Sequence, residues 1–353
     1  MHDSHCWSKG VKVSGGSQCS SWMIIKLGHT DELYPRTIIS ELPDDVLLDI
    51  FGFYVDKGRP FARFGESWHV LVHVCQRWRC LVFASPRRLD LRLLWTNRRP
   101  VKKMLDIWPA LPIFILTDFF PPQGKRDVSN VVLALKRHDR ICKIMIWNTP
   151  KSLIEEFVAI KGPFPVLTHL TLWNEDDDLD VPILPDSFLG GSAPRLRSLL
   201  LERIPFPSLP KLLSSTTGLV ILHLTSVPDS GFISPKVMVT ALSELKSLKS
   251  LGLHFDASRI SAHRENRHPP ASAVTRTILP ALTYFRLSSD GEYVEDFMSQ
   301  IDTPVLDSAI ITFCGQTESD TPQLRHFISR TEAFKAPHQA KVDIQKEEVS
   351  LTF

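Results

Sequence analysis

The hydrophobic pattern near the amino terminus predicts a short helix with one apolar side. Its apolar side chains recur at the period of a helix, at Leu42, Val46, Leu47, Ile50, Phe51 and Tyr54. Pro43 suits the first helical turn, where no backbone N–H is needed, and Asp44 and Asp45 oppose the positive end of the helix dipole. The polar run 57–60 is predicted to end this helix.

A second helix is predicted to begin at Ser67, a suitable N-cap, and to end before Pro86. Its apolar side is made by Trp68, Leu71, Val72, Cys75, Trp78, Leu81 and Val82. We expect Cys75 and Cys80 to lie in the helix interior as small hydrophobic residues. Short helices of this kind cannot bury all their apolar surface among themselves, so a partner or the rest of the chain is expected to cover some of it.

The rest of the chain repeats one pattern, in which an apolar residue is followed by two variable residues and then by alternating large apolar residues. Eight copies begin at Leu111, Ile141, Leu167, Leu196, Leu219, Leu248, Leu282 and Leu306. Their first positions lie 23 to 34 residues apart, with a mean of about 28, which is in the range of leucine-rich repeats. Each copy predicts a short strand whose alternate side chains point to one interior and are buried only by neighbouring units.

The segments between the copies favour helices, at 127–140, 152–161, 208–216 and 234–248. Prolines such as Pro165, Pro194 and Pro280 precede several strands and are expected to end the preceding helix. The predicted fold class is therefore α/β, with a small helical module followed by an irregular leucine-rich-repeat solenoid of parallel strands alternating with helices. The alternative is an α/β sandwich with parallel strands, which has no reason to reuse one motif at every strand.

Two ordered segments carry a resemblance to a known family. The Leu42-Pro43 pair, the two acids and the run from Leu47 to Phe51 are followed by the pattern Val-Cys-x-x-Trp-x-x-Leu at 74–81. Over residues 40 to about 90, this combination resembles the F-box, a helical module that docks a substrate receptor onto the Skp-type adaptor of a cullin-based ubiquitin ligase. The spacer 52–66 is longer than the family's usual turn, and we interpret it as a loop insertion. The whole chain resembles F-box-like domain proteins of filamentous, basidiomycete fungi.

The resemblance implies a substrate-recognition subunit of an SCF-type ligase, with a Skp-type adaptor, and through it a cullin, as partners. We expect three segments: a poorly ordered terminal segment 1–39, an F-box-like module at 40–90 and a degenerate leucine-rich-repeat domain at 91–353. The residues expected to bind the adaptor are Leu42, Pro43, Val46, Leu47, Ile50, Phe51, Val74, Trp78 and Leu81.

The repeats would hold an unidentified target protein. The variable positions of each motif are the candidates, because they face away from the core, and aromatic and arginine side chains are frequent anchors at interfaces. They are Lys143, Trp147, His169, Trp173, Arg197, His223, Lys249, His254 and Arg286. The acidic run 175–180 and the basic stretch 263–270 are further candidates, as loops at the edge of a solenoid.

Composition narrows the classes of function. The net charge of +2 gives no electrostatic case for nucleic acid or an anionic membrane as the main partner, and no apolar run reaches the ~18–20 residues of a membrane span. The six cysteines form no Cys-x-x-Cys pair, and we expect no signal peptide, so the interpretation is a chain with reduced thiols in the cytoplasm or nucleus.

The sequence lacks the common motifs of catalytic and nucleotide-binding sites. The chain has no Gly-x-Gly-x-x-Gly, Walker-type, Gly-x-Ser-x-Gly or His-Glu-x-x-His motif. His69 and His73 are four residues apart near Cys75, but they are expected to flank the aromatic face rather than to bind a metal. We therefore expect no enzyme activity, cofactor or metal. Two alternatives stay open: a repeat scaffold whose first helices only cap the solenoid, and an enzyme with an unrecognised site.

Overall fold

The computed structural model describes residues 38–56, 67–89, 91–95, 111–117, 128–147, 149–174, 183–255, 276–314, 321–335, 341–345 and 348–352. The chain divides into two compact units, Met1–Pro43 and Asp44–Phe353. In the first unit, the described residues hold one short helix, α1 (Ile38–Glu41). Nearly all of the predicted poorly ordered segment 1–39 lies outside the described residues.

The second unit begins with three helices, α2 (Asp44–Asp56), α3 (Ser67–Val72) and α4 (Gln76–Ala84). Their shared interior is apolar and consists of Leu47, Leu48, Phe51, Trp68, Leu71, Val72 and Val82. We call α2–α4 the helical module. The ring of Trp78 lies 4.6 Å from that of Phe51, centroid to centroid, so α4 packs against α2 through an aromatic pair.

The prediction of one continuous second helix was wrong. The chain turns at His73 and Val74, and Cys75 is extended, with φ −155° and ψ 171°, as the N-cap of α4. This break rotates the side chains that follow, and Cys75 and Cys80 are exposed rather than buried in a helix interior. Ion pairs instead join α4 and the turn after it to α2, from Arg77 to Asp44 at 2.6 Å and from Arg88 to Asp49 at 2.5 Å.

The chain then forms an open α/β array. Eleven strands pair in the order β1, β2, β3, β4, β5, β6, β7, β9, β11, β13, β12. Their bounds are β1 (Leu93–Trp95), β2 (Ile113–Leu116), β3 (Ile141–Ile146), β4 (His169–Trp173), β5 (Ser198–Glu202), β6 (Ile221–Val227), β7 (Ser250–Phe255), β9 (Tyr284–Ser289), β11 (Ser308–Cys314), β12 (Lys341–Gln345) and β13 (Glu348–Thr352). Every pair from β1 to β11 is parallel, and β13 and β12 close the end as an antiparallel hairpin. All eight predicted strand motifs are strands, and they pair in chain order.

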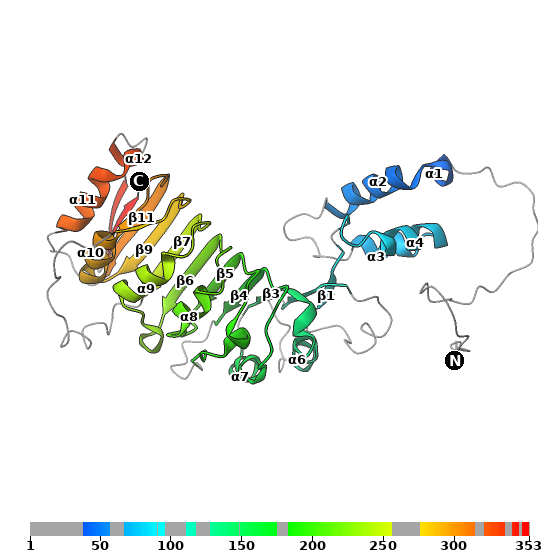
Figure 1. Cartoon of the computed structure of the whole chain (residues 1–353), viewed down its shortest axis with the longest axis horizontal. Helices are drawn as coiled ribbons and strands as arrows, with labels where there is room; N and C mark the ends of the chain where they lie inside the picture. Colours follow the sequence, from blue (N-terminus) through cyan, green and yellow to red (C-terminus); the bar gives the residue numbers. More distant parts are fainter. Residues whose placement is uncertain are drawn as a thin grey trace, which may run out of the picture. The chain divides into compact units, whose positions relative to one another are not determined.

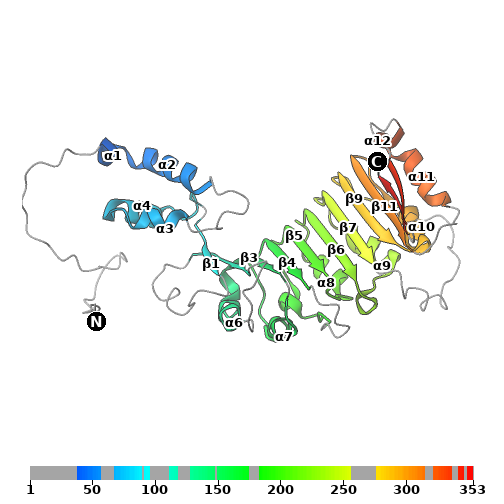
Figure 2. The same cartoon turned by 180° about the vertical axis from the view of Figure 1, so that it is seen from behind.

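Helices follow one face of this sheet (Figures 1 and 2). They are α6 (Ser129–Leu135), α7 (Lys151–Ala159), α8 (Leu209–Leu213), α9 (Pro235–Leu242), α10 (Gly291–Gln300), α11 (Pro322–Arg330) and α12 (Glu332–Lys335). Short 3-10 turns stand at η1 (His138–Arg140), η2 (Phe188–Gly191) and η3 (Asp229–Gly231), and β8 (Thr277–Ile278) pairs with β10 (Ile301–Asp302) away from the main sheet. The four helices predicted between strand motifs are present as α6, α7, α8 and α9.

The alternation of side chains gives the sheet two different faces. In β4, Leu170 and Leu172 are buried, while His169, Thr171 and Trp173 are partly exposed. The buried set joins one continuous core with helix residues such as Leu135, Phe157 and Phe297. We call the other side the open face; a sandwich with helices on both faces would have covered it.

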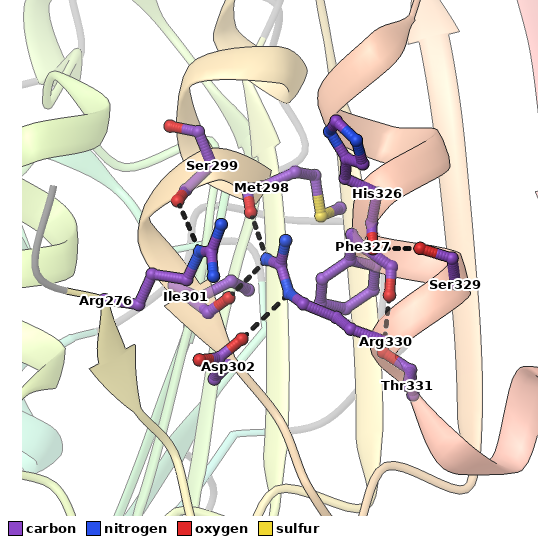
Figure 3. A network of polar contacts seen from close by, with 10 residues as sticks. All are labelled: Arg276, Met298, Ser299, Ile301, Asp302, His326, Phe327, Ser329, Arg330 and Thr331. Atoms are coloured by element: carbon purple, nitrogen blue, oxygen red, sulfur yellow. Dashed lines mark hydrogen bonds and ion pairs between the residues drawn. The ribbon is translucent and has the colours of Figure 1, made fainter. Parts of the chain in front are cut away.

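Arg330 joins the end of α11 to the end of α10 (Figure 3). Its Nη2 donates to the carbonyl oxygens of Met298 and Ile301, each at 2.7 Å, and its Nε forms an ion pair with Asp302 at 2.8 Å. Carbonyls at a helix end have no partner within the helix, so one guanidinium satisfies several of them at once.

We expect Arg330→Met to lower the free energy of unfolding by ~2–3 kcal/mol, because it leaves part-buried carbonyls and a carboxylate without their donor. Urea denaturation followed by circular dichroism measures the change. His326→Met, on an exposed position of the same helix, is the matched control and should change stability by less than ~0.5 kcal/mol. Equal effects of the two substitutions would contradict this role of Arg330.

Candidate binding surfaces

Helix α2 carries apolar side chains on a second side that the protein leaves uncovered. The exposed fractions are 38% for Val46, 44% for Ile50, 69% for Phe53 and 47% for Tyr54. These positions follow the helical spacing i, i+4, i+7 and i+8, so they form one row beside the buried row of Leu47, Leu48 and Phe51. We call Val46, Ile50, Phe53 and Tyr54 the outer α2 face. A helix that is apolar on both sides is expected to meet a partner on the side that remains exposed.

The structure separates the nine adaptor-binding candidates into three groups. Leu47 and Phe51 are 0% exposed and belong to the interior of the module, so they cannot contact a partner directly. Leu42, Trp78 and Leu81 are half-buried. Pro43, Val46, Ile50 and Val74 are exposed.

Three exposed apolar residues of the module were missing from the candidates, Phe53, Tyr54 and Val70, although Tyr54 was part of the predicted apolar side of the helix. Phe53 could have been found, because it stands seven residues after Val46 and three after Ile50, on the same side of the helix. Val70 gave no such signal, since its helix ends two residues later at Val72.

The open face arranges the target-binding candidates in rows across the strands. Lys143 pairs with His169, which pairs with Ser198, and Trp173 pairs with Glu202 in the same register. Further along, Gly252 pairs with both His223 and Arg286, and His254 pairs with Ser288. Parallel pairing of aligned residues places their side chains on one face, so the open face brings together candidates that are far apart in sequence.

Two candidates form an aromatic pair at one end of these rows. The rings of Trp147 and Trp173 lie 5.0 Å apart, centroid to centroid, in an edge-to-face arrangement. Both are half-buried, and Trp147 is fixed by its backbone N–H, which donates to Thr117 Oγ1 at 2.9 Å. Burial raises the pKa of Glu202 beside Trp173. This end of the open face carries two packed aromatic rings with an acid beside them.

His223, another target-binding candidate, lies on β6. Its Nε2 is 2.8 Å from Ser250 Oγ, and a Cβ on Gly252 would approach its ring to 3.1 Å, so the glycine leaves room for the imidazole. Its ring centroid is 6.4 Å from that of Tyr284. Burial and the charge of Arg286 lower the pKa of His223.

His169 and Lys143 are neighbours in a positively charged environment. Burial lowers the pKa of His169, and the charges of Lys143, Arg92 and Arg197 lower it further. Burial and Arg92 likewise lower the pKa of Lys143, whose Nζ lies 5.1 Å from the centroid of the Phe114 ring. These shifts show that several cations lie within electrostatic reach of one another on this part of the open face.

The two histidines predict a dependence of stability on pH. Their folded pKa values lie below the ordinary 6.5, so the unfolded chain binds more protons when the pH falls below that value. The contribution of these two histidines to the free energy of unfolding is therefore complete above pH 6.5. It is lost as the pH falls through 6.5 toward their pKa values in the folded protein. Thermal unfolding between about pH 7.5 and 5 should show a smaller loss for the His169→Gln/His223→Gln variant than for the unmodified chain. An identical pH profile for both proteins would contradict these assignments.

No protein-family model matches the chain, and no curated protein matches it. Roles for the outer α2 face and the open face can therefore be argued only from the residues that form them.

The described part of the chain contains no group of three or more His, Cys, Asp or Glu side chains that could hold a metal ion. His69 lies against Trp68, with ring centroids 3.9 Å apart, and His73 is exposed. In the described ranges, no helix combines the length and the hydropathy needed to cross a bilayer. The candidate loops 175–180 and 263–270 lie outside the described residues.

Proposed function

We propose that the chain is a substrate-recognition subunit of a cullin-based ubiquitin ligase of the SCF type. In this proposal the helical module is an F-box that binds a Skp-type adaptor, and the strands and helices behind it are degenerate leucine-rich repeats that bind a target protein. The observation that carries the proposal is the outer α2 face, an uncovered apolar row on the helix whose sequence resembles the F-box.

The exposed apolar surface of the module comprises Val46, Ile50, Phe53, Tyr54, Val70 and Val74, which are 38–69% exposed. Removing this apolar surface from water on binding would stabilise a complex by ~25 cal/mol for each Å² that becomes buried.

The buried residues of α2 support this surface indirectly. Leu47 and Phe51 fix the helix against Trp78 and the rest of the module, so the outer row is held in one orientation. A pre-organised apolar helix face suits binding in a hydrophobic groove, because little conformational entropy is lost on association.

The open face would hold the target near a ubiquitin-charged enzyme bound elsewhere in the assembly. Such a subunit accelerates the transfer by proximity and needs no nucleophile of its own. Its place of action would be the cytoplasm or the nucleus, where the ligase machinery works.

A scaffold in which the helices only cap the repeats is the second candidate. The observation that favours it is the bond from Trp68 Nε1 to the carbonyl oxygen of Arg92 at 3.0 Å, which ties the module to the chain entering β1. The two candidates differ in one measurement, size-exclusion chromatography of the full chain with a purified Skp-type adaptor. Co-elution supports the ligase subunit, and separate elution at concentrations of about 100 µM supports the scaffold.

A further inference from the structure

A basic hollow lies at the amino-terminal edge of strands β5–β9. It has a volume of about 570 Å³ and is lined by Arg197, Lys246 and Lys249, together with Gly218, Val220, Ser247 and Ala281. All three cationic residues are exposed. Arg197 comes from the turn that leads into β5, and Lys246 and Lys249 come from the turn that leads into β7, so the stacking of strands brings them together.

Backbone hydrogen bonds fix the spacing of these turns. The N–H of Val220 donates to the carbonyl of Arg197 at 2.8 Å, and the N–H of Lys249 donates to that of Val220 at 2.8 Å. Arg197 and Lys249 are therefore two strands apart, a separation of ~10 Å between their backbones. Lys246 stands in the turn just before Lys249, and the three charges surround one concave region.

A further cation, Lys143 of β3, lies on the open face two strands from β5. Ser198, next to Arg197, pairs with His169, and Lys143 pairs with His169 from the other side. The described residues provide no ion pair for Arg197, Lys246 or Lys249 within 4 Å. Two acids stand near this edge. Glu244 is exposed two residues before Lys246, whose N–H donates to the Glu244 carbonyl at 3.1 Å, and Asp307 lies two turns further on, since its N–H donates to the carbonyl of Thr283, whose own N–H donates to that of Lys249. Cations in a concave region that have no ion pair among the described residues attract an anionic partner.

We propose that this basic edge binds an extended acidic segment of a protein partner, which lies across the turns leading into β5, β6 and β7 with its carboxylates at Arg197, Lys246 and Lys249. The inference deepens the proposed function, because it gives the chemical class of the target segment and rests on the repeats being the target-binding part. The argument for the surface itself does not depend on the adaptor.

Geometry favours a carboxylate-bearing chain over a compact oxyanion such as phosphate. A phosphate site is usually built from free backbone N–H groups that converge on one point. Along this edge, the N–H groups of Arg197, Val220 and Lys249 already donate to carbonyls of the preceding turns. Alternate side chains of an extended peptide are ~7 Å apart, so two or three carboxylates can reach cations spread over ~10 Å.

The test uses the full chain and a fluorescein-labelled peptide of ten glutamates, followed by fluorescence anisotropy at low ionic strength. We expect binding that weakens with added salt, because exposed charges are screened. The Arg197→Gln/Lys249→Gln variant should bind at least about 10-fold more weakly. Lys161→Gln/Lys236→Gln removes the same charge from exposed residues at the end of α7 and on α9, and should change affinity by less than about 2-fold.

Three results would overturn the inference. Equal losses in the two double variants would show that only net charge matters. Equal binding of a ten-residue glutamine peptide would exclude charge recognition, and competition by inorganic phosphate at concentrations as low as those of the peptide would indicate a small-anion site instead. Adaptor binding, measured on the same variants, should be unchanged, so a failure of peptide recognition is distinguishable from a failure of the proposed ligase function.

Discussion

Replacing Ile50 and Phe53 together by aspartate is expected to weaken binding of a Skp-type adaptor by at least about 100-fold, because each large apolar anchor at the centre of an interface contributes ~2 kcal/mol or more. The substitution also places two carboxylates where the partner would exclude water, which adds an unfavourable desolvation term. Both side chains are exposed in the free protein, so its thermal unfolding should stay nearly unchanged. Isothermal titration calorimetry with purified adaptor measures the loss.

The matched control is Val237→Asp/Val305→Asp. These residues are 47% and 49% exposed, similar to Ile50, but they belong to α9 and to the loop before β11. The control should bind the adaptor like the unmodified chain, and equal losses in both double variants would show that the outer α2 face has no special role. Leu47→Asp is unsuitable for this purpose, because it buries a carboxylate inside the module and would unfold it.

Phe297→Ala is expected to lower the free energy of unfolding by ~3–5 kcal/mol, the range for deletion of a large aromatic side chain from a core. Phe297 is fully buried on α10, and its ring is nearly parallel to those of Phe285, 5.9 Å away, and Tyr293, 6.2 Å away. The buried hydroxyl of Tyr293 donates to the carbonyl of Ile233 at 3.1 Å, so this aromatic stack also anchors the segment before α9. The surroundings therefore cannot collapse easily into the cavity that alanine would leave.

Urea denaturation monitored by circular dichroism tests this expectation. Phe53→Ala removes the same side chain from a position that is 69% exposed and should cost less than ~0.5 kcal/mol. A loss below ~1 kcal/mol for Phe297→Ala would contradict a well-packed core at this end of the array. A large loss would show that the array is stabilised by its own core.

The repeat pattern predicted most of the sheet because each short strand obeys a simple rule. In copies such as Leu196 to Leu201, the alternating leucines face the helices and the residues between them face outward. The hairpin of β12 and β13 was not predicted, since it does not follow the motif and runs antiparallel. Helix α10 lay outside the predicted helices, although Asp290 gave a local signal as its N-cap, accepting from the N–H of Tyr293 at 2.7 Å.

The binding surfaces were less predictable, because helical periodicity identifies apolar rows without saying which row is buried. Val46 and Leu47 are adjacent and both apolar, yet only tertiary packing places Leu47 inside and Val46 outside. Arg197 and Lys249 were individual candidates, but their gathering in one basic hollow was not predicted. Arg197 and Lys249 are 52 positions apart in the sequence, and only the stacking of turns makes them neighbours.

The central claim, that the outer α2 face docks the adaptor, is tested most directly by site-specific photocrosslinking. A photoreactive phenylalanine analogue at Phe53 should form a covalent adduct with a purified Skp-type adaptor, and the same analogue at Val237 should not. Absence of an adduct from Phe53, or equal adducts from both positions, would contradict the claim.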